Sequence, residues 1–140
     1  MINFNYELDF KLDNESAYAD WISKVISSEI KGEGDINYIF CDDNYLVEIN
    51  QQYLNHDTLT DIISFDYSIG KELHGDIFIS VERVRENAVD FSVPFENELK
   101  RVMAHGVLHY CGYKDKTEEE EMVMRQKEEE KMKMFHVKQN

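Results

Sequence analysis

Hydrophobic and polar residues alternate strictly at the start of the chain, and this alternation constrains the fold more than any other feature. The hydrophobic positions are Ile2, Phe4, Tyr6, Leu8, Phe10 and Leu12, and every intervening residue is polar. Side chains of a β-strand point to opposite faces in turn, so the pattern predicts an amphipathic strand with one face in water. The aromatic residues on the hydrophobic side favour a strand further.

Strand and helix patterns then follow one another along the rest of the chain. The expected elements are a helix capped by Asn14 and closed by Gly32 and Gly34, a strand at Ile36–Cys41, a helix capped by Asp42 or Asp43, strands at Thr60–Tyr67 and Asp76–Val81, and helices from Ser80 to about Phe91, from Pro94 to Gly112 and over Thr117–Phe135. The two later strands flank a turn near Gly70, which predicts an antiparallel pair. This order predicts one α+β domain over residues 1–140, with a small mixed four-stranded sheet and helices packed mainly on one face.

The composition excludes several classes of protein. One proline and six glycines in 140 residues exclude collagen-like and linker-like chains. No segment reaches the roughly 18 uninterrupted apolar residues of a membrane span. The first residues lack the basic and apolar regions of a signal peptide, and two cysteines without an export signal favour a reducing compartment. We therefore expect a cytoplasmic protein with no membrane partner.

The charge balance is strongly acidic, with 15 Lys and Arg against 29 Asp and Glu and a net charge of −14. Taken alone, this counts against a nucleic-acid partner, because phosphate binding depends on Lys and Arg. Seven of the glutamates lie in two runs at 118–121 and 128–130, however, so a local basic groove is compatible with the total. We expect the last helix to be a solvated face, with sparse apolar positions at Met122, Val123, Met132 and Phe135.

The segment from His105 to Asp115 carries the clearest chemical signal. His105 and His109 are four residues apart on a predicted helix, so both imidazoles leave the same face. Gly112 ends the helix, and the turn lets Asp115 reach back over that face. Two nitrogens and one carboxylate oxygen, with a fourth position open for water, are the ligand set of a catalytic zinc site. The sequence therefore predicts one zinc ion per chain, on a helix and the loop after it.

Other residues of ligand type are weaker candidates. His56, His74 and His136 have no partners at ligand spacing and are expected to be surface or structural residues. Cys111 lies two residues from His109, hence on another face of the helix, and is expected to be a small buried residue. The same ligand set also serves non-haem iron, so the native metal stays open between zinc, manganese and iron, with zinc preferred.

The residues HGVLHYCGYKD, from His105 to Asp115, resemble the signature of the YbeY family of bacterial endoribonucleases, the rRNA maturation factors. Further residues that fit the family pattern are Asn50, Tyr53, Asp57, Thr60–Phe65 and Gly75–Ile77. The resemblance covers about residues 40–125. It implies a small zinc-dependent α+β hydrolase that cleaves single-stranded RNA, in maturation of the 16S rRNA 3′ end and in ribosome quality control. The implied partners are the rRNA precursor and the small ribosomal subunit, with no DNA.

Two positions depart from the family pattern. The first two zinc histidines of the family correspond to His105 and His109, but its third ligand, commonly histidine, is Asp115 here. Aspartate also binds zinc, so we expect the metal site to persist. An arginine that the family commonly carries before its Thr-Asp strand, assigned to RNA binding or catalysis, corresponds to Leu54.

Binding and cleavage of RNA also need cations and a proton donor near the metal. Lys100, Arg101, Lys114 and Lys116 flank the motif, and Lys71 and His74 are expected on a strand connection that faces it. The proton donor for the leaving oxygen stays open, with Asp61, Asp76 and His74 as candidates by expected proximity.

Three functional hypotheses follow. The first is a zinc-dependent endoribonuclease, in which water activated by the metal attacks a phosphodiester. The second is a ribosome-assembly binding factor with a structural or degenerate metal site, which the net charge and Leu54 favour. The third is a metalloprotease, which is disfavoured because Gly106 stands where such enzymes carry a glutamate base directly after the first histidine.

Overall fold

A computed structural model describes residues 1–54 and 60–136 of the chain. Its elements are β1 (Ile2–Tyr6), α1 (Glu15–Ser28), β2 (Gly32–Cys41), α2 (Asp43–Leu54), β3 (Ile62–Asp66), β4 (Glu72–Ser80), α3 (Val81–Asp90), α4 (Phe95–Tyr110) and α5 (Glu118–Met132). This order confirms the predicted succession of strands and helices, and the α+β class with it. No helix of the described residues is long and apolar enough to span a bilayer.

The four strands form one mixed sheet in the order β1-β2-β4-β3. β1 pairs with β2 in parallel, β2 pairs with β4 in parallel, and β3 pairs with β4 in antiparallel orientation. The predicted antiparallel pair is therefore confirmed. In its register, Ile62 lies opposite Ile79 and Asp66 lies opposite Gly75, so the start of β3 is next to the end of β4.

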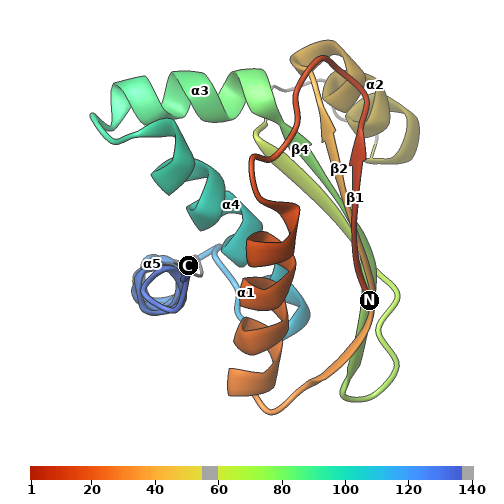
Figure 1. The fold of residues 1–140 in the computed structure, drawn as a ribbon, viewed down its shortest axis with the longest axis vertical. Coiled ribbons are helices and arrows are strands. Elements are labelled where there is room, and N and C mark those ends of the chain that lie inside the picture. Colours follow the sequence, from red (N-terminus) through yellow and green to blue (C-terminus); the bar gives the residue numbers. More distant parts are fainter. Residues whose placement is uncertain (55–59, 137–140) are drawn as a thin grey trace.

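The helices cover the two faces of the sheet unequally, as Figure 1 shows. α1 and α4 pack on one face and bury the larger core, which includes the alternating residues of the first segment. α2 packs on the opposite face over a smaller cluster of Cys41, Leu46 and Ile63. α3 and α5 both pack against α4. α4 is thus enclosed by the sheet and three helices, which gives it a fixed position.

Two predicted boundaries are wrong at the glycines after the first helix. α1 ends at Ser28, and Ile30 turns the chain with a φ of 58°, so Gly32 and Gly34 lie inside β2 instead of closing the helix. A Cβ at Gly34 would overlap the His74 ring, so the glycine allows this ring to lie against the strand. At the start of the chain, β1 ends at Tyr6, although the hydrophobic face continues to Leu12, which is buried.

The helix caps largely follow the predictions. The Asn14 side chain accepts from the backbone N–H of Ala17, and the Ser80 side chain accepts from that of Arg83. Asp42, rather than Asp43, caps α2 through the N–H of Tyr45. Each of these contacts satisfies a backbone donor that the first helical turn leaves unpaired.

Candidate metal centre

α4 and the loop after it bring the three predicted ligands together. His105 and His109 leave the same face of α4, with their Nε2 atoms 2.9 Å apart. α4 ends at Tyr110, and Gly112 takes a φ of 104°, a left-handed conformation that favours glycine. The loop then returns, so that Asp115 Oδ2 lies 3.1 Å from His105 Nε2 and 3.3 Å from His109 Nε2.

Both histidine rings are held by their other nitrogen. His105 Nδ1 lies 2.7 Å from Oε2 of Glu128 on α5, and His109 Nδ1 lies 2.9 Å from the carbonyl oxygen of Tyr113. A carbonyl oxygen only accepts, so Nδ1 of His109 carries the proton and its Nε2 presents a lone pair. The carboxylate of Glu128 favours the same tautomer of His105.

This donor set fits a divalent metal ion. Two Nε2 lone pairs and a carboxylate oxygen that face one another within 3.3 Å repel unless a cation lies between them. Tetrahedral zinc with bonds of about 2.0–2.2 Å holds its ligand atoms about 3.3–3.5 Å apart, close to the separations seen here. Among the described residues, these three side chains form a group whose ligand atoms are close enough together to hold one metal ion.

The pKa of His105 reflects the same need for positive charge. Burial of the ring acts to lower the pKa, but the hydrogen bond and charge of Glu128, with the charges of Asp115 and Asp61, outweigh it. The pKa is therefore raised, so that a proton occupies the site more readily when no metal does.

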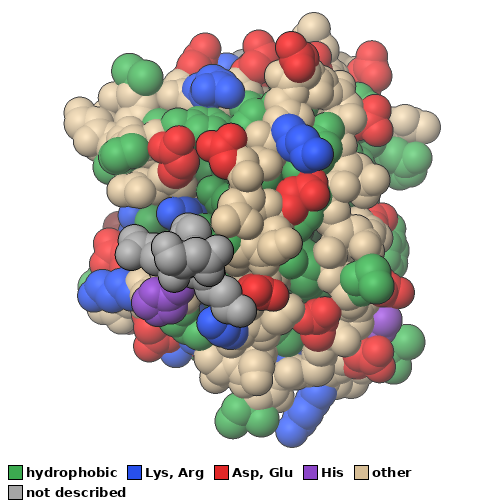
Figure 2. All heavy atoms as spheres, viewed as in Figure 1, with side chains coloured by type: hydrophobic (Ala, Val, Ile, Leu, Met, Phe, Trp, Pro, Cys, Tyr) green, Lys and Arg blue, Asp and Glu red, His purple; other side chains and the backbone are tan. Residues whose placement is uncertain are grey.

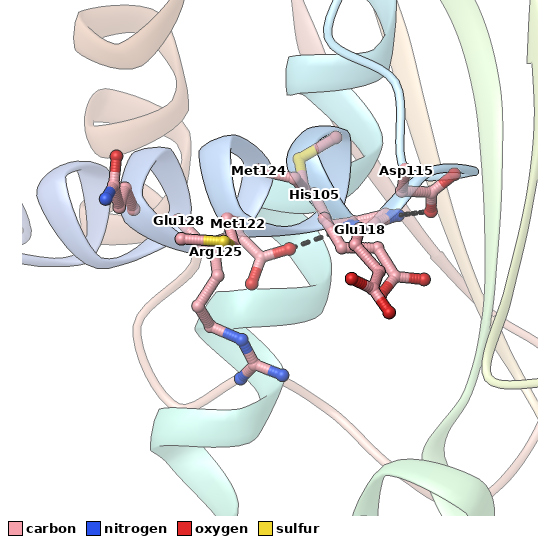
Figure 3. Close-up of a pocket in the computed structure, with 9 residues that line it drawn as sticks. His105, Asp115, Glu118, Met122, Met124, Arg125 and Glu128 are labelled. Carbon is pink, nitrogen blue, oxygen red and sulfur yellow. Dashed lines mark hydrogen bonds and ion pairs between the residues drawn. The ribbon is translucent and has the colours of Figure 1, made fainter.

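A hollow of about 430 Å³ opens beside the three ligands. It lies between β3, the end of α3, α4 and α5, and its lining includes Asp61, Arg101, Arg125 and Glu128. Burial raises the pKa of Asp61, against the opposing charge of His105. A second hollow, drawn in Figure 3, lies between His105, Asp115 and α5. The ligands therefore border open space on both sides of α5.

Arg101 extends the hydrogen bonding of His105 into the protein and forms an ion pair with Glu98. Arg101 donates to Glu128 Oε1 over 3.2 Å, and its Nε lies 3.6 Å from Glu98 Oε1. Glu128 thus uses one carboxylate oxygen for Arg101 and the other for His105. Glu98 and Glu128 are both buried, and burial raises the pKa of Glu98.

Of the proposed proton donors, Asp61 lies in the hollow and the other two do not. His74 and Asp76 line a different hollow with Asp35 and Asn37. Side chains alternate along β4: Ile77 packs into the core under α4, so His74 and Asp76 point to the other face. The prediction that His74 faces the motif is therefore wrong, whereas Lys71 is exposed in the turn before β4 and its orientation stays a prediction.

The cations that flank the motif in sequence are dispersed in space. Arg101 lines the hollow, whereas Lys100 lies over the Phe135 ring with Nζ 4.0 Å from its centroid. Lys114 and Lys116 are exposed on the loop after α4. Cys111 is half-buried against the core and lies outside the metal-binding group.

The structure describes only some of the positions before β3 that fit or depart from the family pattern. Asn50 is buried on α2, and Tyr53 is exposed, with its ring 5.8 Å from that of Phe65. Leu54 ends α2, but its side chain is outside the described part of the chain, as are His56 and Asp57. The consequence of leucine at this position therefore stays a prediction.

Sequence reasoning missed Glu128, Arg125 and the Tyr113 carbonyl. The last helix was expected to be solvated, yet it buries Met124, Glu128 and Lys131, while Met122 and Val123 are exposed. These three buried positions follow the i, i+4, i+7 spacing of one helix face. Two of its three members are charged, so a search for apolar stripes does not find this face.

Known proteins resemble this chain over its whole length. Residues 3–136 match the protein family described as Endoribonuclease YbeY. A relative of that name from Flavobacterium psychrophilum is 74% identical over 140 residues, which is 100% of both chains. One from Flavobacterium johnsoniae is 69% identical, covering 99% of this chain and 100% of the relative. A Thermotoga maritima protein solved in solution superposes with a TM-score of 0.73 at 27% identity, covering 96% of this chain and 89% of that one.

Proposed function

The chain belongs to the YbeY endoribonuclease family, and from this premise we propose that it cleaves single-stranded RNA at one zinc ion bound by His105, His109 and Asp115. The observation that carries the proposal is the geometry of the ligand atoms, which lie 2.9–3.3 Å from one another. Both histidine rings are already oriented by Glu128 and Tyr113, and a hollow borders the site. This arrangement supports a preformed, accessible metal site.

The chemistry divides between the metal and the protein. When bound, zinc supplies a Lewis acid and lowers the pKa of water, which provides a nucleophile at neutral pH. Asp61 lines the same hollow, and burial raises its pKa, so its carboxyl group holds a proton more readily than an ordinary aspartate. We assign to Asp61 the donation of this proton to the leaving oxygen of the RNA.

The cellular role follows from the family resemblance. We propose that the substrate is an rRNA precursor, that cleavage contributes to the 3′ end of 16S rRNA and to ribosome quality control, and that the protein meets the small ribosomal subunit in the cytoplasm. The name of the two Flavobacterium relatives, Endoribonuclease YbeY, supports RNA as the substrate class.

The two competing hypotheses are less consistent with the site. A structural zinc usually has four protein ligands, often cysteine, whereas three ligands next to open space are typical of catalysis. A protease of the histidine-pair class needs glutamate in place of Gly106. A Cβ there would already lie 3.0 Å from Ile77 and 3.2 Å from Ile62, so this position faces the sheet instead of the hollow.

Two measurements test the proposal together. Elemental mass spectrometry should find about one zinc per chain in the purified protein and sharply less in Asp115→Ala. Zinc-loaded protein should cut a single-stranded rRNA fragment, leave the same fragment intact when annealed to its complement, and lose activity in His109→Ala. An exposed histidine gives the matched control, His136→Ala, which should keep both zinc and activity.

Three results would contradict different parts of the proposal. Intact RNA with wild-type protein that holds zinc would overturn the nuclease assignment. Co-sedimentation of such protein with ribosomal subunits would then support the binding-factor hypothesis. Equal cleavage by wild type and His109→Ala would show that the activity comes from a contaminant.

A further inference from the structure

One large hydrophobic side chain lines the hollow beside the metal ligands and contributes to neither hydrophobic core. Phe91 follows the last residue of α3 and is 56% exposed. It shares the hollow with Arg101, His105 and Asp115. Its place at the edge of a polar hollow that borders the proposed metal ligands makes this exposed aromatic ring a candidate for contact with a ligand.

Backbone hydrogen bonds fix the main chain on both sides of Phe91. The Phe91 N–H donates to the Asn87 carbonyl, and the Val93 N–H donates to the Ala88 carbonyl over 3.0 Å. Ser92 between them has a φ of 56°, which fixes a tight turn before α4. Asn87, one helical turn before Phe91, lines the same hollow and donates weakly to Asp61 over 3.5 Å. The backbone that carries the ring is therefore hydrogen-bonded on both sides of Ser92.

Arg125 is the second unused group of this region. Its side chain is exposed and lines the hollows on both sides of the metal ligands. Figure 3 shows its guanidinium extending from α5 toward α4. Unlike Arg101, which is paired with Glu98 and Glu128, Arg125 makes no ion pair among residues 1–54 and 60–136, although its charge acts on Glu98 through space. Its five N–H donors are free for an anion.

The charge of the protein limits how RNA can bind here. The net charge is −14, and on the face drawn in Figure 2 the Lys and Arg side chains are scattered among Asp and Glu rather than gathered. Long-range attraction of phosphates is therefore weak. Stacking of a base on an aromatic ring does not depend on net charge and accepts every base. An acidic nuclease therefore depends on base stacking more than a basic nuclease does.

We propose that Phe91 and Arg125 form a nucleotide subsite of the RNA-binding hollow, in which Phe91 stacks on a base and Arg125 binds a phosphate next to the cleaved bond. The inference rests on the proposed function. Along α4 the hollow runs from Glu98 to His109, or about 16 Å, so it is long enough to hold neighbouring nucleotides.

The subsite also accounts for a preference for single strands. A base can stack on the Phe91 ring only after it separates from its neighbouring bases and its pairing partner. The free-energy cost of this separation is small in a single strand and large in a duplex. Loss of the ring should therefore reduce the difference in affinity between single-stranded and duplex RNA.

The test measures binding and cleavage separately. Binding of a short fluorescein-labelled single-stranded RNA is followed by anisotropy in the His109→Ala background, in which the RNA stays uncut. Phe91→Leu should weaken binding about 5- to 160-fold, the range for one lost base stack, and Phe91→Tyr should restore most of it. Val89→Ala, an exposed position of α3 outside the hollow, is the control.

Arg125 is tested by the salt dependence of the same binding. Arg125→Gln should reduce the slope of log affinity against log salt by about 0.7, the value for one phosphate of a single strand. Lys24→Gln removes an equal charge from an exposed site on α1 and should leave the slope unchanged. Zinc content is measured for the same substitutions made in the protein that keeps His109. It should equal that of the wild type, which separates the subsite from the metal site.

The outcomes are distinguishable. Wild-type protein that cuts RNA, while Phe91→Leu and Arg125→Gln bind and cut as well as the controls, would overturn the subsite and leave the proposed function standing. Wild-type protein that neither binds nor cuts RNA would overturn both.

Discussion

Glu128→Gln is the substitution that most directly tests how the metal ligands are held. Each oxygen of the Glu128 carboxylate accepts from a different donor, His105 Nδ1 at 2.7 Å and Arg101 at 3.2 Å. Glutamine has a single acceptor oxygen, and its amide nitrogen would face the other donor. The substitution therefore removes one of two charge-assisted bonds without changing the size of the side chain.

The expected losses follow from these contacts. If His105 loses its anchor, metal affinity should fall about 10- to 100-fold, or roughly 1.4–2.7 kcal/mol. If Arg101 loses its partner instead, the metal-free protein should lose about 1.5 kcal/mol of stability, at the low end for a hydrogen bond to a charged group. Arg101 keeps Glu98 at 3.6 Å, which limits that loss.

Zinc competition against a chromophoric chelator measures the affinity, and urea unfolding of metal-free protein measures the stability. The matched control is Glu129→Gln, the same change at the next residue of α5, which is exposed. Equal zinc affinity and equal stability in the two variants would refute the reasoning, since Glu128 would then anchor neither His105 nor Arg101.

Two further predictions concern stability, and chemical denaturation measures both. Gly75→Ala should destabilise by about 1–3 kcal/mol, because a Cβ there would overlap Tyr110. At Gly32 a Cβ would make only van der Waals contacts at 3.8 Å, so Gly32→Ala should cost less than about 1 kcal/mol; equal losses would contradict this. For Glu29, burial acts to raise the pKa, but hydrogen bonds from Lys131 and Tyr113 and nearby lysine charges outweigh it. Because the folded pKa lies below the unfolded one, stability present above about pH 4.5 is lost as pH falls through the folded value, so Glu29→Gln should flatten this acid loss, and an unchanged slope would count against it.

The convergence of the three proposed metal ligands could be predicted from sequence because their geometry is local. A spacing of four residues on a helix places His105 and His109 on one face, and the glycine two residues after the helix lets Asp115 return. No long-range packing has to be known for these three atoms to converge.

The partners of these ligands depend on packing between elements far apart in sequence. Three glutamates occupy 128–130, and periodicity within α5 alone does not say which of them meets His105. Only the docking of α5 on α4 selects Glu128.

The positions of the two wrongly predicted proton donors, His74 and Asp76, follow from strand alternation. Ile77 and Ile79 are expected inside because they are apolar, so strand alternation already places Asp76 and His74 on the opposite face. Asp61 lies before β3, where alternation gives no answer, and its place in the hollow comes from the antiparallel pairing with β4.

The two histidine anchors differ in how they respond to mutation. His105 depends on the side chain at position 128, so a single codon change weakens it. His109 depends on a main-chain oxygen at position 113, which every amino acid supplies. Substitutions in α5 can therefore change metal affinity while the three proposed ligands stay the same. The orientation of His109 depends only on the backbone of the loop, so it is retained when the side chains of that loop change.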